Sequence, residues 1–191
     1  DEMIPPTRGT DWGDNGIWRT LHGHNWDATH AFIRDSWNGL NARVFKCSQI
    51  LASDPTTQQK AEAQALRAFN MFHFVDLWGQ TPLRPVTLNG DEPTPVLTRS
   101  AGFDQVVKDL EEALPNLPAG GPGQNLTCTK AMANAMLARC YLNKAVFKSA
   151  NPAGPYTFDA ADMAKVISYC DAVKAEGFSL DPDYFNNFLT S

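Results

Sequence analysis

The sequence has few basic side chains and no long apolar run, and both absences narrow its function. Lys and Arg account for 16 of the 191 residues, against 21 Asp and Glu, which gives a net charge of −5. A basic surface that would neutralise nucleic-acid phosphates is therefore absent, which argues against DNA or RNA as a partner. No apolar stretch approaches the roughly 20 residues that span a bilayer, so no transmembrane helix is predicted.

Cysteine is scarce as well, and its spacing carries no motif. Cys47, Cys128, Cys140 and Cys170 lie far apart, and no Cys-x-x-Cys pair occurs. A zinc ribbon or a redox motif is therefore not indicated. Three of the four fall on the apolar faces of predicted helices, where a small buried thiol is ordinary, so we interpret them as structural free thiols.

Periodic apolar residues predict a series of helices after residue 27. The alternating spacing of three and four residues is typical of an apolar stripe on a helix. The predicted helices cover residues 28–52, from Asp54-Pro55 to Gly79, from Ser100 to Pro115, 127–148 and 158–176. Asp54 and Ser100 are the expected caps, Thr127 or Thr129 starts the fourth helix, and Asp159 caps the fifth. We found no convincing set of strands.

Several packing expectations follow from this pattern. The second helix carries apolar side chains on two faces and is expected to lie between neighbours. Arg67 in that helix is interpreted as a structural anchor for helix-end carbonyls or for a carboxylate such as Glu62. Residues 80–99 contain four prolines and are predicted to be an extended connection, whereas the aromatic tail 178–189 is expected to pack back on the helices.

The fold class that results is all-α, with stacked helical hairpins behind an irregular front segment. We treat residues 1–191 as a single helical domain with a loop region at 1–27 and hairpins at 28–191. Residues 127–148 and 158–176 are similar to a tetratricopeptide hairpin, because Leu137, Ala138 and Tyr141 match its Leu, small and aromatic positions. An insertion at 148–156 breaks the usual period of that repeat.

The front loop is the best candidate for a ligand-binding surface. It holds three of the five tryptophans together with Gly, Asp and Asn. Sugars bind where aromatic planes stack on their C–H faces and polar groups bond to their hydroxyls. The predicted ligand-binding residues are Arg8, Asp11, Trp12, Asp14, Asn15 and Trp18. The alternative is that these tryptophans only attach the loop to the helical scaffold.

Other chemistries find weaker support in the sequence. Asp11 and Asp14 could form the carboxylate pair of a glycosidase, but no sequence pattern places them across a bond. The run from Asp11 to Gly16 faintly resembles a calcium loop and lacks the closing Glu of an EF-hand. His22, His24 and His30 would suit zinc, yet nothing completes a known motif, and hydrogen-bonded loop histidines are the simpler interpretation. No serine lies in a recognisable nucleophile elbow. We therefore predict no catalytic residue, no metal site and no cofactor.

A set of short motifs in order along the chain resembles the SusD/RagB family. The set begins with Asp1-Glu2-Met3 and continues with Leu66-Arg67-Ala68-Phe69, Phe74-Val75-Asp76-Leu77-Trp78-Gly79-Gln80-Thr81-Pro82-Leu83, Thr98-Arg99, Asp109-Leu110-Glu111-Glu112-Ala113-Leu114, Leu117-Pro118, Thr129-Lys130-Ala131, Met136-Leu137-Ala138-Arg139-Cys140-Tyr141-Leu142-Asn143, Phe178-Ser179-Leu180 and Tyr184. Each piece alone is a common helix pattern, whereas the ordered set is specific.

The resemblance implies a surface lipoprotein of the bacterial outer membrane. Members of this family bind a glycan, sometimes a peptide, and act as the lid of a SusC-like TonB-dependent transporter. They are not enzymes, and they are longer than this chain, so we expect a fragment that holds the N-terminal tetratricopeptide-containing part. The lipid anchor would lie upstream of Asp1. The alternative function is a tetratricopeptide-type scaffold that binds a peptide or a protein.

Overall fold

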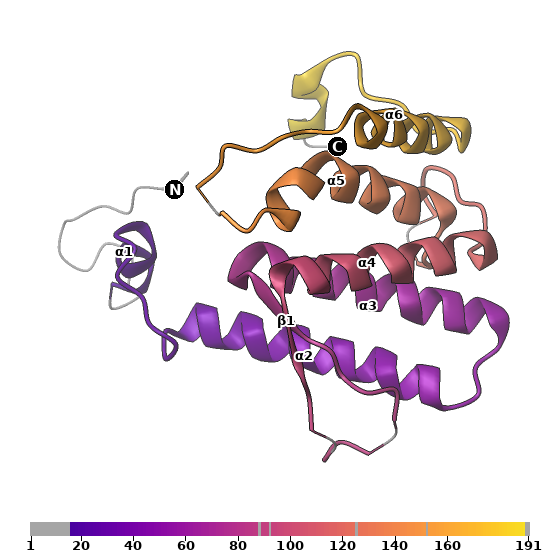
Figure 1. Cartoon of the computed structure of the whole chain (residues 1–191). Helices are drawn as coiled ribbons and strands as arrows, with labels where there is room; N and C mark the ends of the chain where they lie inside the picture. Colours follow the sequence, from indigo (N-terminus) through magenta and orange to yellow (C-terminus); the bar gives the residue numbers. More distant parts are fainter. Residues whose placement is uncertain (1–15, 88, 92, 125, 152, 190–191) are drawn as a thin grey trace. The chain divides into compact units, whose positions relative to one another are not determined.

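The computed structural model describes residues 16–87, 89–91, 93–124, 126–151 and 153–189. Among these residues helices dominate, and the two short strands pair with each other (Figure 1). The all-α prediction is confirmed. The elements in chain order are α1 (Ile17–His22), α2 (Ala31–Ala52), α3 (Thr57–Trp78), β1 (Gln80–Pro82), β2 (Val96–Thr98), α4 (Arg99–Ala113), the 3-10 turn η1 (Leu114–Asn116), α5 (Lys130–Lys148), α6 (Ala160–Ala175) and the 3-10 helix η2 (Tyr184–Phe188).

The chain divides into two compact units, residues 1–42 and 43–191. The boundary lies inside α2 and so comes later than the division between residues 27 and 28 that the composition suggests. The first unit holds α1 and the beginning of α2, and the second holds the end of α2 with all later elements. Helix α1 occupies part of the segment that the sequence predicts as loop with at most short pieces of structure.

The start of α3 is set by Thr56, so the predicted Asp54-Pro55 cap is wrong. The Thr56 Oγ1 accepts the backbone N–H of Gln59 at 3.3 Å, and the Gln59 Oε1 accepts the backbone N–H of Thr56 at 3.0 Å. This reciprocal capping box satisfies two backbone donors at the end of the helix. Asp54 instead has a positive φ of 57° in the turn before the cap.

The remaining helix ends follow local side-chain chemistry. Thr98, and not Ser100, caps α4, while Thr129 and Asp159 cap α5 and α6 as predicted. Each of these side chains accepts a backbone N–H that the helix itself leaves unpaired. Gly79 ends α3 in the left-handed conformation with φ of 66°, which a residue without a Cβ adopts at little cost.

Two helical hairpins stack in the second unit. Helix α3 packs against α4, α4 against α5, and α5 against α6 (Figure 1). Leu137, Ala138 and Tyr141, the positions similar to a tetratricopeptide hairpin, are all buried. The largest fully buried hydrophobic side chains are Val44, Met71, Phe72, Phe74, Val75, Val106, Leu110 and Leu137. The core therefore lies along α3, α4 and α5.

The connection between the two helices of the first hairpin is a small antiparallel ribbon. Strands β1 and β2 pair with Thr81 opposite Leu97, which brings the two ends of the extended segment together. Thr81 is fully buried, and Gly102 of α4 lies directly against it. A Cβ on Gly102 would lie only 2.5 Å from Thr81 Cγ2, so the close approach of ribbon and helix requires glycine there.

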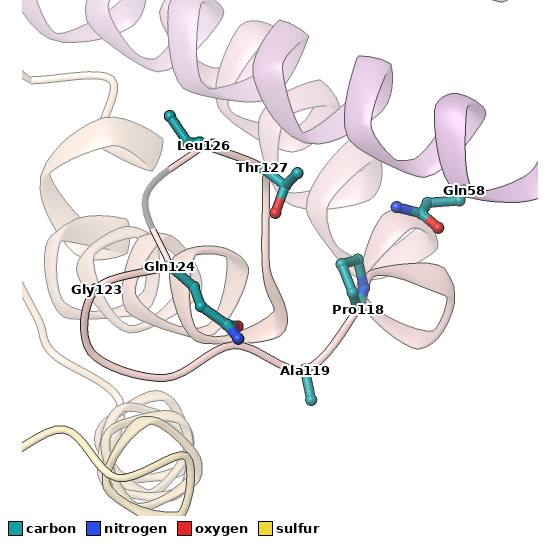
Figure 2. Close-up of a pocket in the computed structure, with 7 residues that line it drawn as sticks. All are labelled: Gln58, Pro118, Ala119, Gly123, Gln124, Leu126 and Thr127. Atoms are coloured by element: carbon teal, nitrogen blue, oxygen red, sulfur yellow. The ribbon is translucent and has the colours of Figure 1, made fainter.

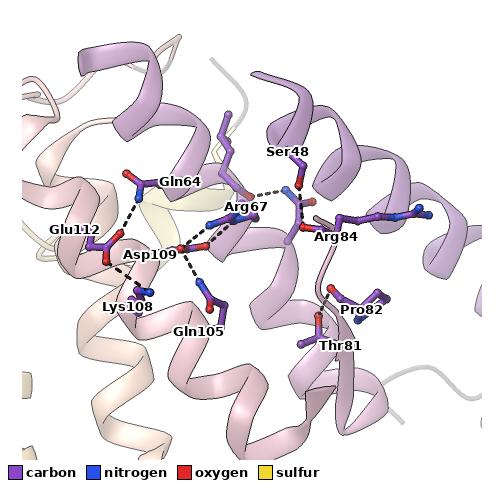
Figure 3. A network of polar contacts seen from close by, with 12 residues as sticks. Ser48, Gln64, Arg67, Thr81, Pro82, Arg84, Gln105, Lys108, Asp109 and Glu112 are labelled. Atoms are coloured by element: carbon purple, nitrogen blue, oxygen red, sulfur yellow. Dashed lines mark hydrogen bonds and ion pairs between the residues drawn. The ribbon is translucent and has the colours of Figure 1, made fainter. Parts of the chain in front are cut away.

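A buried ion pair joins α3 to α4 (Figure 3). Arg67 Nε donates to Asp109 Oδ2 at 2.7 Å, Arg67 Nη2 donates to Oδ1 at 2.8 Å, and Gln105 Nε2 donates to the same Oδ1 at 2.9 Å. The two charged side chains are only 8% and 1% exposed. Arg67 is thus an anchor as predicted, but its partner is Asp109 on the next helix and not Glu62.

The expected burial of α3 on two faces is confirmed in part, and the expected packing of the tail is wrong. On α3, Phe74 of the second apolar face is fully buried, whereas Leu66, Phe69 and Leu77 are 42%, 37% and 63% exposed. In the tail, Leu180 is 95% exposed and the aromatic side chains of η2 are exposed as well. Buried side chains lie around most of α3, and the apolar pattern alone does not reveal which positions stay exposed.

The burial of the cysteines follows the prediction from the apolar stripes only in part. Cys47, Cys128 and Cys140 are buried, whereas Cys170 on α6 is exposed. Helix α6 has no buried residue, and α5 is its main packing partner among the described helices. Burial raises the pKa of the Cys128 thiol to about 11 and that of the Cys140 thiol to about 12.

Candidate functional site

The first unit presents a partly exposed aromatic pair. Trp18 on α1 is 37% exposed and Phe32 on α2 is 39% exposed. Their ring centroids lie 4.8 Å apart with an angle of 47° between the planes. His30 adds a third ring 5.9 Å from Phe32. We call Trp18, His30 and Phe32 the Trp18 cluster. Two of its rings keep more than a third of their surface in contact with solvent, and carbohydrate stacking needs accessible aromatic surface.

Hydrogen bonds through His30 hold α1 beside the beginning of α2. Its Nε2 lies 3.2 Å from the carbonyl oxygen of Ile17 and 3.0 Å from Thr20 Oγ1. Because a carbonyl oxygen only accepts, the Nε2 donates its hydrogen to Ile17. The Nδ1 of His30 is buried without a hydrogen-bond partner among the described residues. The imidazole therefore fixes the relative positions of Trp18 and Phe32.

A tight turn precedes α2 and orients His30. Asp27 Oδ1 accepts the backbone N–H of Thr29 at 2.8 Å and the Thr29 hydroxyl at 2.6 Å. These bonds lower the pKa of Asp27 below its ordinary value, and the bond from the Thr29 hydroxyl has the larger effect. The backbone N–H of His30 donates to the Asp27 carbonyl at 3.2 Å. The turn thus keeps an ionised carboxylate close to the ring cluster at neutral pH.

A second exposed indole lies in the same unit. Trp26 is 44% exposed, and its ring centroid is 5.1 Å from that of His24. His24 has a positive φ of 53°, so the chain turns sharply between α1 and this indole. The first unit therefore carries two partly exposed tryptophans, Trp18 beside the Phe32 ring and Trp26 beside the His24 imidazole.

The structure tests little of the predicted ligand set. Trp18 is described, is 37% exposed and lies with its ring tilted against that of Phe32. Arg8, Asp11, Trp12, Asp14 and Asn15 lie outside the described residues. The convergence of these six side chains on one ligand stays a prediction, as do the glycosidase pair and the calcium loop built from Asp11 and Asp14.

Phe32 is a candidate that the sequence reasoning missed. It is 39% exposed, and it lies one residue before Ile33, the first residue of the apolar stripe on α2, so it falls outside that stripe. An aromatic side chain on the polar side of an amphipathic helix was the available signal. Trp26 was noted among the tryptophans of the front loop but was not assigned to the site.

The described part of the chain contains neither a candidate metal site nor a candidate membrane-spanning helix. No three His, Cys, Asp or Glu side chains in that part are placed to hold a metal ion. His24 and His30 are instead engaged in ring contacts, and His30 also in hydrogen bonds. Within the same residues no helix combines the length and the apolarity needed to cross a bilayer.

The second unit contains a hollow of about 470 Å³ near the beginning of α3 (Figure 2). Gln58 lies on one side of it and Gln124 on the other, with Pro118 between the two amides and Thr127 above. Among the described residues, no charged side chain and no aromatic ring lines it. Amide groups can bond to hydroxyls, but the hollow lacks a ring on which a sugar could stack.

The comparisons with known proteins point to one group. No protein-family profile matches the chain. Among curated proteins, a SusD-like protein of Formosa agariphila is 28% identical over 125 residues, which cover 61% of this chain and 24% of that protein. The chain thus spans about a quarter of the length of this relative.

Solved structures share the fold at low sequence identity. A SusD-like protein of Bacteroides fragilis covers 90% of this chain with a TM-score of 0.67 and 21% identity, over 32% of its own length. A structure solved with a xylogluco-oligosaccharide gives a TM-score of 0.75 with 20% identity, over 90% of this chain and 35% of its own. A laminarin-binding SusD-like protein gives a TM-score of 0.72 with 19% identity, over 94% of this chain and 39% of its own.

Proposed function

We propose that this chain, which is similar in sequence and in fold to SusD-like proteins, contributes to glycan capture at the surface of a bacterial outer membrane. In this proposal it is part of a lipid-anchored protein that delivers oligosaccharides to a SusC-like TonB-dependent transporter. One of the similar structures was solved with a xylogluco-oligosaccharide, and another is a laminarin-binding protein. Both likenesses favour a neutral glycan as the ligand.

The exposed rings of the Trp18 cluster are the observation that carries the proposal. A monomeric scaffold would bury large aromatic side chains where it has the neighbours to do so, because their burial is the main source of stability. Here Trp18 and Phe32 keep more than a third of their surface open although His30 and the Asp27 turn hold the two helices together. Fixed, open ring faces are suited to stacking against the C–H face of a sugar.

We propose binding without catalysis. Hydrolysis of a glycoside needs two carboxyl groups about 5–10 Å apart across the bond, one of them with a raised pKa. Beside the Trp18 cluster the described carboxylate is Asp27, and its pKa is lowered by its bonds to Thr29. An ionised carboxylate of this kind accepts hydrogen bonds from hydroxyls and does not protonate a leaving group.

Calorimetric titration with laminarin and with a xylogluco-oligosaccharide tests the proposal. We expect binding to at least one of the two, and a roughly 2- to 10-fold weaker affinity in Trp18→Ala and in Phe32→Ala, as the loss of one ring contact of about 0.5–1.5 kcal/mol implies. Phe185→Ala is the matched control, because Phe185 is an equally aromatic side chain that is 72% exposed on η2. Binding that is equally strong in all four proteins would refute the role of the cluster.

A peptide-binding scaffold is the second candidate function. Leu66, Phe69 and Leu77 on α3 are 42%, 37% and 63% exposed, and Leu142 on α5 is 49% exposed. His73, whose ring centroid lies 4.8 Å from that of Phe69, adds a polar group beside one of these side chains. Exposed apolar surface rimmed by polar groups is typical of protein interaction sites.

Substitutions on the two surfaces distinguish the two candidate functions. A scaffold function predicts saturable capture of peptides from a displayed library, lost in Phe69→Glu and kept in Trp18→Ala. Glycan capture predicts the opposite response to the same two substitutions. Glycan binding that disappears in Phe69→Glu alone, with the fold intact by circular dichroism, would favour neither surface as assigned.

A further inference from the structure

A second hollow of the second unit, about 410 Å³ in volume, lies where α5 ends and α6 begins. Lys144, Ala145 and Lys148 line it from α5, and Asp162 lines it from α6. The connecting segment, which corresponds to the insertion that interrupts the tetratricopeptide period, supplies Tyr156 among others. This segment runs past the end of α5 before it returns to α6 (Figure 1).

The charges that line this hollow are balanced in pairs. Lys144 Nζ donates to Asp162 Oδ1 at 2.8 Å, and Lys148 Nζ donates to Asp104 Oδ2. The lining itself contains two lysines and two aspartates, since Asp159 also faces it. An anion would meet carboxylates at close range and a cation would meet ammonium groups, so neither gains a clear attraction. The balance favours a neutral ligand that both accepts and donates hydrogen bonds.

Tyr156 provides an apolar plane beside these polar groups. The ring is half-buried, and the backbone of Gly154 packs on it so closely that an added Cβ would lie 3.4 Å from a ring carbon. Pro155 and Ala145 extend the apolar part of the wall, and Thr157 adds a hydroxyl. A ring, a few apolar carbons and paired charges match the alternating C–H and hydroxyl surface of a saccharide.

The wall that carries Tyr156 is braced by its own hydrogen bonds. Arg99 Nη2 of α4 donates to the carbonyl oxygen of Ser149 at 2.7 Å. Asn151 accepts the backbone N–H of Ala153 at 3.1 Å and donates to the carbonyl oxygen of Gly154. Bonds that exist before a ligand arrives lower the ordering cost of binding.

We propose that this hollow is a saccharide subsite of its own, for one or two residues of a neutral glycan. The inference rests on the proposed function, because it takes the glycan as the ligand. Its volume lies at the low end of the roughly 300–1,000 Å³ that is usual for small-molecule sites, so it suits a short unit and not a long chain. The hollow beside Gln58 has a similar volume but lacks both ring and charge, and we assign it no ligand.

Backbone NMR of the full chain, labelled with ¹⁵N and titrated with laminaribiose, tests the subsite. We expect amide shifts at Lys144, Ser149 and Thr157 that saturate together. Ala145→Phe, which fills the hollow from α5, and Tyr156→Ala, which removes the ring, are each expected to weaken these shifts at least tenfold in apparent affinity. Tyr184→Ala is the matched control, because that tyrosine is 68% exposed on η2. Trp18→Ala should leave the shifts around Ser149 unchanged.

The outcomes distinguish this inference from the proposed function. Shifts confined to the Trp18 cluster would overturn the subsite and leave glycan capture standing. Absence of binding to laminaribiose, laminarin and the xylogluco-oligosaccharide would overturn both. Shifts around Ser149 that persist in the filled and the ring-deleted variants, both folded by circular dichroism, would place the ligand elsewhere and refute the assignment.

Discussion

Removal of Asp109 is expected to destabilise the chain more than any exposed substitution. The carboxylate is 1% exposed and accepts two bonds from Arg67 and one from Gln105. In Asp109→Ala the guanidinium of Arg67, itself 8% exposed, would be left buried without its counter-ion. Breaking a buried pair from one side costs about 3–5 kcal/mol. For a chain of this size that corresponds to a fall in melting temperature of roughly 6–20 °C.

Replacement of both Arg67 and Asp109 is expected to lower the free energy of unfolding much less than replacement of Asp109 alone. In the double variant Arg67→Met/Asp109→Leu no charge has to be taken out of water, and side chains of similar volume fill the space between α3 and α4. Replacement of a buried ion pair by apolar side chains is often neutral or stabilising. We therefore expect the double variant to lie well above Asp109→Ala in stability, with a large coupling energy between the two positions.

Urea unfolding followed by far-UV circular dichroism measures these differences. Asp171→Ala is the control, since its carboxylate lies 3.5 Å from Lys174 with both side chains more than 60% exposed (64% and 73%). That pair is expected to contribute no more than about 1 kcal/mol. A loss below about 1 kcal/mol in Asp109→Ala, or a double variant as unstable as the sum of its singles, would refute the reasoning about buried charge.

Three further outcomes follow from close contacts and burial. Gly102→Ala places a Cβ 2.5 Å from the Thr81 methyl and is expected to cost about 1–3 kcal/mol by urea unfolding, with part recovered by Thr81→Ser, which removes that methyl. At pH 8, iodoacetamide is expected to modify exposed Cys170 first by mass spectrometry, because burial raises the pKa of the Cys140 thiol to about 12 and the other two thiols are also buried. Burial is the larger cause and the bond to the Glu111 carboxylate the next in raising the pKa of Tyr141 from 10.0 to about 12. The folded state therefore keeps this proton to a higher pH than the unfolded chain does. Between those pH values the stability of the wild type should fall relative to Tyr141→Phe; parallel pH curves would contradict this.

The helices could be predicted from the sequence because their signals are local. Apolar spacing, Gly79 and the caps at Thr129 and Asp159 all act within a few residues of the helix that they define. The error at Asp54 is instructive, because Asp54-Pro55 also fits a start signal. The reciprocal bonds of Thr56 and Gln59 satisfy one more donor and set the start two residues later.

Relations between helices could not be predicted in the same way. The partner of Arg67 lies on the following helix, and Glu62 was favoured only because it is near in sequence. The apolar pattern of α3 was real, but it could not show that Leu66, Phe69 and Leu77 stay more than a third exposed while Phe74 is buried. A stripe reports which face can be buried, whereas the number of elements that cover it is a property of the tertiary fold.

The same limit applies to the candidate site. Trp18 was found because indoles and glycines concentrate in the front segment, a compositional signal. Phe32 contributes through its 4.8 Å contact with Trp18, and that contact depends on the His30 bonds to α1. Side chains that act on a ligand by being held next to one another leave little trace in a single sequence.

In the second unit, the residues that stabilise the fold and the residues that line the two hollows lie in different segments, so ligand specificity can change without loss of the fold. The buried pair of Arg67 and Asp109 and the fully buried hydrophobic side chains lie on the helices. Both hollows instead lie at connections: one uses residues 118–127 and the other residues 149–159, each joined by side chains from a helix end. Connecting segments tolerate substitution and insertion far better than packed helices do. Ligand preference is therefore expected to reside in these two segments, and an exchange of residues 149–159 should alter saccharide binding while unfolding in urea stays nearly unchanged.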